Sequence, residues 1–323
     1  MGIKSIFHIN INCSNIKKSV EFYSDQIGLH ATPITIPEHL RSTYDPAIKK
    51  ILDLKVDGRV DFEPYFLGAS DAQDTATIDL IQWNAPKYSG RAYEQLNNLG
   101  IARIALLVDD IDAMYRRLVS NGIDCLSEPR TLVADSGDKF RCVAFRDPDG
   151  TVMEFVQTVF PPPAGAKLGA RKLFHVNINC SDLKTSIDFY RDTLGMQALL
   201  QTGFSGSQDL GELLSLGEPA SADVCLLATE EGAEGTLIDL VEWKKPRVVG
   251  TPHKELTNLG MPRMAFLADD VDAMHENLSH KGVRFRSDPV TIHFDPPLGK
   301  IRAVCFYDPD GTSLELFEMN YTK

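Results

Sequence analysis

The chain has 323 residues, of which 43% are hydrophobic and 24% charged, and its formal net charge is −12 at pH 7. This length suits two domains that each bury a core, and the negative charge argues against nucleic acid or an anionic membrane as a partner. The scattered cysteines form no CxxC pair, no apolar run is long enough for a membrane helix, and "MGIKSIFHIN" lacks a signal-peptide layout, so we expect a reduced, cytoplasmic protein.

The sequence repeats itself. "FHININCS" at 7–14 is matched by "FHVNINCS" at 174–181, and "LNNLGIARIALLVDDIDAM" is matched by "LTNLGMPRMAFLADDVDAM". Matches that recur in the same order indicate a tandem duplication. We therefore predict a first domain over 1–159, a linker rich in Pro, Gly and Ala over 160–171, and a second domain over 172–323.

The first predicted element is a strand with one polar face. In "SIFHININ", polar and apolar residues alternate, so His8, Asn10 and Asn12 share one face and Phe7 lies on the other. The same pattern in repeat 2 predicts an equivalent strand.

A helix and three further strands follow that first strand. Ser14 stands where a helix N-cap belongs, and Gly28 provides a stop. Strand-like stretches cover roughly 31–36, 59–67 and 75–83. Together these elements make one βαβββ unit.

The pattern then restarts within the same repeat. "ARIALLVDD" predicts a strand, "IDAMYRRLVSNG" a helix that ends at Gly122, and "FRCVAFRDPDGTVMEFVQ" a hairpin with "DPDG" as its turn. Each repeat thus holds two βαβββ units. Because one unit leaves an open sheet edge and a bare apolar face, we expect the two units of a repeat to close into one cup.

This set of features resembles the vicinal-oxygen-chelate superfamily, which includes glyoxalase I, bleomycin-resistance proteins and extradiol dioxygenases. The resemblance is carried by the four βαβββ units, by "FY…LG" in the first helix and by "DPDG" before the last strand. It implies an α+β fold, a tandem repeat of two glyoxalase-like domains, each made of two βαβββ modules that form a cup-shaped sheet. It does not fix the activity, because the superfamily hosts several reaction types.

The resemblance also implies four pocket positions per cup, on the first and last strands of two paired units. Superfamily enzymes use these positions to hold a divalent metal. Transferred to this sequence within each repeat, the candidate residues are His8, Asp79, Arg103 and Glu154 in repeat 1, and His175, Asp239, Arg263 and Glu315 in repeat 2.

Arginine stands at one expected ligand position in each repeat. It has no lone pair to offer and stays protonated, so we expect no metal cofactor. A weaker divalent-metal site is the fallback. Its ligands would be His175, Asp239 and Glu315, or His8, Asp79 and Glu154.

Two interpretations of the arginines remain open at this point. Arg103 beside Glu154, and Arg263 beside Glu315, could be buried ion pairs that replace a lost metal site. Alternatively the arginine holds a developing oxyanion, while the histidine, oriented by the aspartate, accepts a proton near neutral pH.

Substrate contacts are expected from amides and indoles on the same strand faces. These candidates are Asn10, Asn12 and Trp83 in repeat 1, and Asn177, Asn179 and Trp243 in repeat 2. The segment 36–58 is longer than its counterpart in repeat 2 and carries His39, Arg41 and Tyr44. It is either a lid on the first cup or an inert excursion.

The predicted function is a metal-independent lyase or isomerase that acts on a small carbonyl or aromatic compound. The alternative is a small-molecule-sequestering, resistance-type binding protein, and a metal-dependent dioxygenase ranks below both. By analogy with four-unit members of the superfamily, repeat 2 is expected to supply the working cup. The expected partner is a small molecule, and the expected state is a monomer or homodimer.

Overall fold

The computed structural model describes residues 2–41, 47–69, 76–294 and 299–320. Repeat 1 supplies two βαβββ units, as predicted. The elements of repeat 1 are β1 (Ile3–Cys13), α1 (Ile16–Glu21), the π-helical turn η1 (Phe22–Ile27), β2 (Leu29–Pro33), α2 (Glu38–Arg41), α3 (Ala47–Ile51), β3 (Asp61–Ala69), β4 (Thr77–Ala85), β5 (Gly100–Val108), α4 (Ile111–Ser120), β6 (Arg130–Val133), β7 (Lys139–Arg146) and β8 (Val152–Gln157).

Repeat 2 has the same order of strands. Its elements are β9 (Ala170–Asn179), α5 (Leu183–Asp188), the π-helical turn η2 (Phe189–Thr193), β10 (Gln197–Ser207), α6 (Gln208–Leu213), β11 (Ala220–Ala228), the 3-10 turn η3 (Gly232–Glu234), β12 (Leu237–Lys245), β13 (Arg263–Ala268), α7 (Val271–His280), β14 (Val290–His293), β15 (Lys300–Tyr307) and β16 (Ser313–Asn320). None of the helices in the described ranges is long and apolar enough to cross a membrane.

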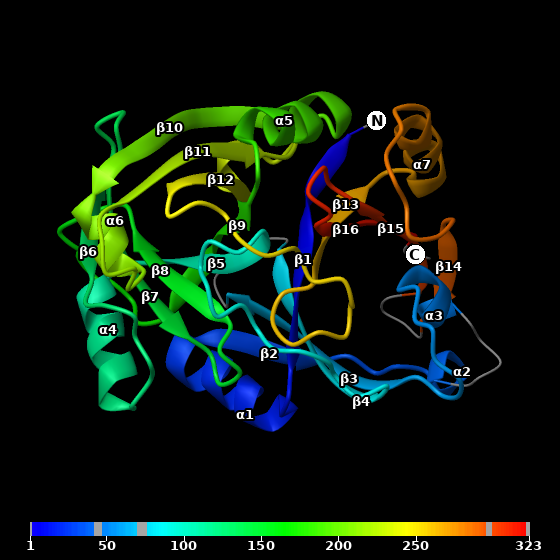
Figure 1. Cartoon of the computed structure of the whole chain (residues 1–323). Coiled ribbons are helices and arrows are strands. Elements are labelled where there is room, and N and C mark those ends of the chain that lie inside the picture. The colour runs from blue at the N-terminus through cyan, green and yellow to red at the C-terminus, as the bar shows by residue number, and fades with distance from the viewer. Residues whose placement is uncertain (1, 42–46, 70–75, 295–298, 321–323) are drawn as a thin grey trace.

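The strands form two curled eight-stranded sheets (Figure 1). The first has the order β14-β15-β16-β13-β1-β4-β3-β2, and we call its concave side cup A. The second has the order β10-β11-β12-β9-β5-β8-β7-β6, and we call its concave side cup B. Each sheet therefore takes one unit from each repeat, and the expectation that the two units of one repeat share a cup is wrong.

Two antiparallel contacts join the repeats. Strand β1 pairs with β13, with His8 opposite Ala265, and β5 pairs with β9, with Ala105 opposite His175. Each contact covers the strand edge that a single unit would leave open, so the repeats depend on each other for closed sheets.

The local signals that position the first helix are mostly those read from the sequence. Gly28 ends the helical segment with φ of 86°, a left-handed conformation that favours glycine. The N-cap, however, is Asn15 rather than Ser14, because the Asn15 side chain accepts a hydrogen bond from the Lys18 backbone N–H.

The recurring "FY" and "DPDG" motifs meet each other in the core. The Tyr23 hydroxyl donates to Asp147 Oδ2 at 2.8 Å, and the Tyr190 hydroxyl donates to Asp308 Oδ2 at 3.2 Å. Asp147 also accepts from the backbone N–H of Thr151, which fixes the turn. The two units of a repeat are thus linked back to back through a central apolar core, and not through a shared cup.

Candidate functional site

The fold regroups the predicted site residues. Cup A brings together His8 and Asp79 of repeat 1 with Arg263 and Glu315 of repeat 2, because β4, β1, β13 and β16 are neighbouring strands. The within-repeat grouping with Arg103 is therefore wrong.

Cup B holds the other set in the same way. It joins Arg103 and Glu154 of repeat 1 to His175 and Asp239 of repeat 2. Both fallback metal sets are wrong as well, since the set with Glu315 and the set with Glu154 each mix residues from the two cups.

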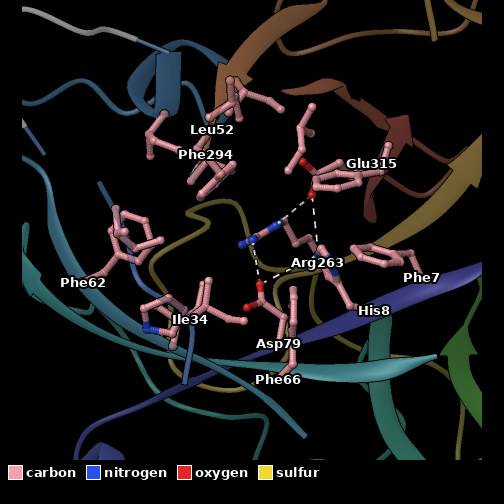
Figure 2. A pocket seen from close by; sticks show the side chains of 18 of the residues that line it. Phe7, His8, Ile34, Leu52, Phe62, Phe66, Asp79, Arg263, Phe294 and Glu315 are labelled. Carbon is pink, nitrogen blue, oxygen red and sulfur yellow. Dashed lines mark hydrogen bonds and ion pairs between the residues drawn. The ribbon is translucent and has the colours of Figure 1, made fainter. Parts of the chain in front are cut away.

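In cup A the guanidinium of Arg263 lies between two carboxylates (Figure 2). Its Nε donates to Glu315 Oε2 at 3.2 Å, its Nη2 to Asp79 Oδ2 at 3.1 Å, and its Nη1 to Asn10 Oδ1 at 3.0 Å. Arg263, Asp79 and Glu315 are 6%, 6% and 4% exposed, so this is a buried charge cluster.

Cup B has the same residues but a looser arrangement. Arg103 Nε donates to Glu154 Oε2 at 2.8 Å, and Nη1 donates to Asn177 Oδ1 at 3.1 Å. Its Nη2 lies 3.6 Å from Asp239 Oδ2, which is an ion-pair distance beyond a normal hydrogen bond. Asp239 is therefore held less tightly than Asp79 is in cup A.

A β-bulge lies directly before the histidine in each of the strands β1 and β9. The register of β1 shifts between Ile6 and His8, and the register of β9 shifts between Leu173 and His175. As a result Phe7 and His8 both line cup A, and Phe174 and His175 both line cup B. The prediction that Phe7 faces away from the histidine is wrong. The recurrence of Phe directly before His in both repeats was the available signal.

The two histidines, His8 and His175, are buried at the floors of the cups. Neither ring nitrogen of His8 or His175 finds a partner among the described residues. His8 Nε2 lies 3.8 Å from Asp79 Oδ2 and 3.8 Å from Glu315 Oε2, while His175 Nε2 lies 3.7 Å from Asp239 Oδ2. Imidazole nitrogens left this way are available to a ligand.

The surroundings make both histidines weak bases. Burial lowers the pKa of His175 to about 4, with Arg103 adding to the decrease and Glu154 opposing it. Burial and the charge of Arg263 hold the pKa of His8 well below its ordinary value. Neutral imidazole is the resulting form in the ligand-free protein, and both histidines are weaker bases there than an ordinary histidine.

The carboxyl groups shift in the opposite direction. Burial raises the pKa of Asp79 to about 6, against the influence of Arg263 and with that of Glu315. Burial also raises the pKa of Asp239, although Arg103 and Asn177 oppose the shift. The pKa values of both aspartates therefore move toward neutral pH, which makes the two carboxylates stronger bases.

The carboxylates at the floor of each cup are arranged to bind the arginine and not a metal ion. In each cup the guanidinium already binds the glutamate that a metal would need. Among the described residues, no group of three His, Cys, Asp or Glu side chains has a geometry suited to a metal. A divalent cation beside a fixed guanidinium would also be repelled by it.

The predicted amide contacts divide into two kinds. Asn10 and Asn177 accept from the arginines and so position them. Asn12 has a different place, because its Nδ2 donates to the carbonyls of Leu256 and Asn258 at 2.8 and 2.7 Å, and its Oδ1 accepts from Trp83.

Asn179 repeats this arrangement in cup B. It donates to the carbonyls of Leu96 and Asn98 at 2.8 and 2.7 Å and accepts from Trp243 Nε1 at 2.9 Å. Asn12 therefore ties β1, and Asn179 ties β9, to a loop of the other repeat. Neither asparagine lines a cavity, whereas Trp83 and Trp243 do.

The cavities differ in size. Cup A encloses about 90 Å³ and cup B about 270 Å³. An apolar cavity of about 150 Å³ suffices to bind benzene in another protein, so cup B alone is large enough for an aromatic ring in this conformation.

Each cup is covered by a short helix. Ile48 and Ile51 of α3 line cup A, and Leu210 and Leu213 of α6 line cup B. The described part of the longer segment of repeat 1, through Ile36 and α3, thus lines cup A and is not an inert excursion. In that segment His39 Nε2 hydrogen-bonds the His293 carbonyl at 2.9 Å. Tyr44 and the Arg41 side chain lie outside the described residues.

Above the polar floor, the walls of both cavities are mostly apolar. In cup A the aromatic rings of Phe7, Phe62 and Phe66 surround the polar cluster (Figure 2). In cup B, Phe174 corresponds to Phe7, whereas the other two rings come from different strands, Phe140 from β7 and Phe204 from β10, a wall that the sequence patterns did not reveal. Such walls strengthen any charge interaction at the floor by excluding water.

Comparison with known proteins identifies the family. The family model described as Glyoxalase/Bleomycin resistance protein/Dioxygenase superfamily matches residues 5–155 and 172–316. The chain belongs to this superfamily. Its members often use divalent metals, a use that the arginine in each cup does not favour here.

Individual relatives are distant. Over 150 residues the chain is 27% identical to the uncharacterized protein YraH of Bacillus subtilis (strain 168), a match that covers 46% of this chain and 98% of YraH. Glyoxalase I from Zea mays is similar in structure, with a TM-score of 0.66 at 18% identity over 97% of this chain and 92% of that enzyme. At this identity the similarity extends to the fold alone.

Proposed function

We propose that the protein is a lyase or isomerase that moves a proton on a small, largely apolar carbonyl or aromatic compound in cup B, without drawing on a metal ion. One observation carries this proposal. His175, whose ring nitrogens have no hydrogen-bond partner in the part of the chain that the structure describes, lies with the loosely held Asp239 at the floor of a mostly apolar cavity of about 270 Å³.

Asp239 is the proposed proton acceptor. Its raised pKa brings it closer to the working pH than an ordinary aspartate, which favours proton transfer. The neutral His175 would position the substrate through a hydrogen bond, as donor or acceptor according to its tautomer.

Arg103 is the proposed oxyanion partner. Its hydrogen bonds to Glu154 and Asn177 use two of the five N–H groups of a guanidinium. A remaining N–H can donate to a carbonyl oxygen as negative charge develops there, and fixed donors in a dry site are effective at this.

The proton balance is simple. Asp239 takes a proton from the carbon next to the carbonyl, and the electron pair of that C–H bond moves toward the oxygen held by Arg103. If a carbon–carbon double bond is conjugated with this enolate, return of the proton to the far carbon of that double bond gives an isomer. Loss of a leaving group from the neighbouring carbon gives an elimination product.

A second candidate, a protein that sequesters a small molecule, is favoured by the apolar walls of both cavities. Such a protein would bind the same kind of compound and release it unchanged.

Deuterium incorporation distinguishes the two candidates. Uncharged aryl ketones such as phenylacetone are incubated with the protein in D₂O after treatment with a chelator, and exchange next to the carbonyl is followed by NMR. We expect exchange that falls by about 10²–10⁴ in Asp239→Asn. Binding without exchange supports sequestration. Exchange that requires an added divalent metal contradicts the metal-independent mechanism.

A further inference from the structure

The polar floors of the two cups differ in how well their carboxylates are satisfied. In cup A, Asp79 accepts a hydrogen bond from Arg263 at 3.1 Å. In cup B the corresponding distance from Arg103 to Asp239 is 3.6 Å, and Asn177 Nδ2 reaches Asp239 Oδ2 only at 3.4 Å. Within the described ranges, Oδ1 accepts no hydrogen bond in either aspartate, so the difference between the cups lies in the longer contacts of Asp239 Oδ2. The buried Asp239 carboxylate of cup B can therefore accept further hydrogen bonds from a ligand.

The charges that face cup B do not cancel. The Arg103 guanidinium is matched by Glu154 at 2.8 Å, and the exposed Lys139 and Asp138 at the rim offset each other. His175 is held neutral by burial, which lowers its pKa to about 4. When Asp239 is ionised, its carboxylate leaves one negative charge at the floor of the cavity, where the residue is 7% exposed.

A second anion in this cavity would be strongly disfavoured. Two like charges a few ångströms apart in a water-poor cavity repel each other far more than in water. A hydrogen-bond donor, in contrast, would satisfy Asp239 and relieve the cost of its burial.

Building on the proposed function, we infer that the ligand of cup B carries, besides the carbonyl oxygen that Arg103 holds, a hydrogen-bond donor without negative charge, a hydroxyl or an ammonium group that donates to Asp239. The body of the ligand is apolar and lies against Phe140, Phe174 and Phe204. Compounds that present a carboxylate or a phosphate to the floor are rejected.

Three small compounds of one shape test this inference. Benzylamine, benzyl alcohol and benzoate share an aromatic ring and carry a positive, a neutral and a negative head group at pH 7. Their affinities are measured by NMR titration of the whole chain, and their positions are located by crystal soaking. We expect the amine and the alcohol to bind in cup B at least about tenfold more tightly than benzoate.

Two variants test whether the charge of Asp239 causes the preference for the amine and the alcohol over benzoate. In Asp239→Asn the disadvantage of benzoate should disappear, because the buried negative charge is removed. Asp223→Asn is the matched control. It removes the same charge from an exposed side chain of β11, a strand that also lines cup B, and it should leave the ranking unchanged.

Several results would overturn the inference. They are benzoate binding in cup B as tightly as the amine and the alcohol, binding of none of the three compounds there, and a ranking that Asp239→Asn leaves intact. If that variant does not fold, the ranking in the native protein decides alone. Deuterium exchange is scored separately, so an enzyme that accepts anions would keep the proposed function while this inference fails.

Discussion

Arg263 Nη2 of repeat 2 donates to Asp79 Oδ2 of repeat 1 across 3.1 Å, although 184 residues separate them in the chain. The same guanidinium binds Glu315 on the neighbouring strand. Each polar cluster is therefore shared between the repeats, and its chemistry and its stability both depend on their association.

Replacing Arg263 by Met should destabilise the protein strongly. The change leaves Asp79 and Glu315 without a cation in a cavity of only about 90 Å³, which has little room for water. We expect a loss of about 3–5 kcal/mol in the free energy of unfolding, measured with urea.

Further variants test whether the loss of stability comes from the two unpaired carboxylates. Adding Asp79→Leu and Glu315→Leu to Arg263→Met should recover most of the loss, since no charge then stays buried. Arg302→Met is the control, because Arg302 pairs with Asp272 at the surface and its loss should cost about 1 kcal/mol or less. A fully stable Arg263→Met protein would show that water solvates the two carboxylates.

The pH dependence of stability should reveal the buried His175. The unfolded chain binds a proton at this histidine below about pH 6.5, whereas the folded chain binds it only near its pKa of about 4. Stability from this group is thus present above pH 6.5 and is lost as the pH falls toward 4.

This effect is measured by comparing wild type with His175→Gln in urea unfolding at pH 7 and pH 4. Over that range wild type should lose roughly 3 kcal/mol more than the variant, at 1.36 kcal/mol per pKa unit. His30→Gln, at an exposed position, is the control and should follow wild type. Equal slopes for wild type and His175→Gln would mean that His175 titrates normally.

Asn179 should prove to be a structural residue. Its amide binds two carbonyls and the Trp243 indole, and all of these would lose a partner in Asn179→Ala. We expect a loss of at least about 2 kcal/mol in unfolding free energy. Asn121→Ala removes an exposed hydrogen bond to the Arg117 carbonyl and should change stability little. Unchanged stability of Asn179→Ala would return this residue to the list of ligand contacts.

Residues 1–159 alone should not form a stable monomer. In this fragment β1 lacks β13 and β5 lacks β9, so both sheets have open edges. Two copies can pair these edges, and we expect a homodimer by light scattering. Mixing the fragment with residues 172–323 should give a heterodimer instead. A folded monomeric fragment would contradict the shared architecture and support two independent domains.

Much of the fold follows from the sequence. Strand alternation, the Gly28 stop and the "DPDG" turn are local signals, because they depend on backbone preferences of a few neighbouring residues. The duplication revealed four βαβββ units, and a buried ion pair with glutamate was one of the two interpretations that the arginine at a ligand position left open. The pairing of Arg103 with Glu154 holds because both lie in the same unit, on adjacent strands.

Only the tertiary structure decided which units share a cup. Strand β1 could have met β5 or β13, whose sequences are nearly alike, and nothing local distinguishes the two partners. The bulges that turn Phe7 and Phe174 into the cavities arise where the two repeats pair, so strict alternation could not predict them. The weak basicity of His175 likewise has its main cause in burial, a property of the packed molecule that its neighbours in the sequence do not encode.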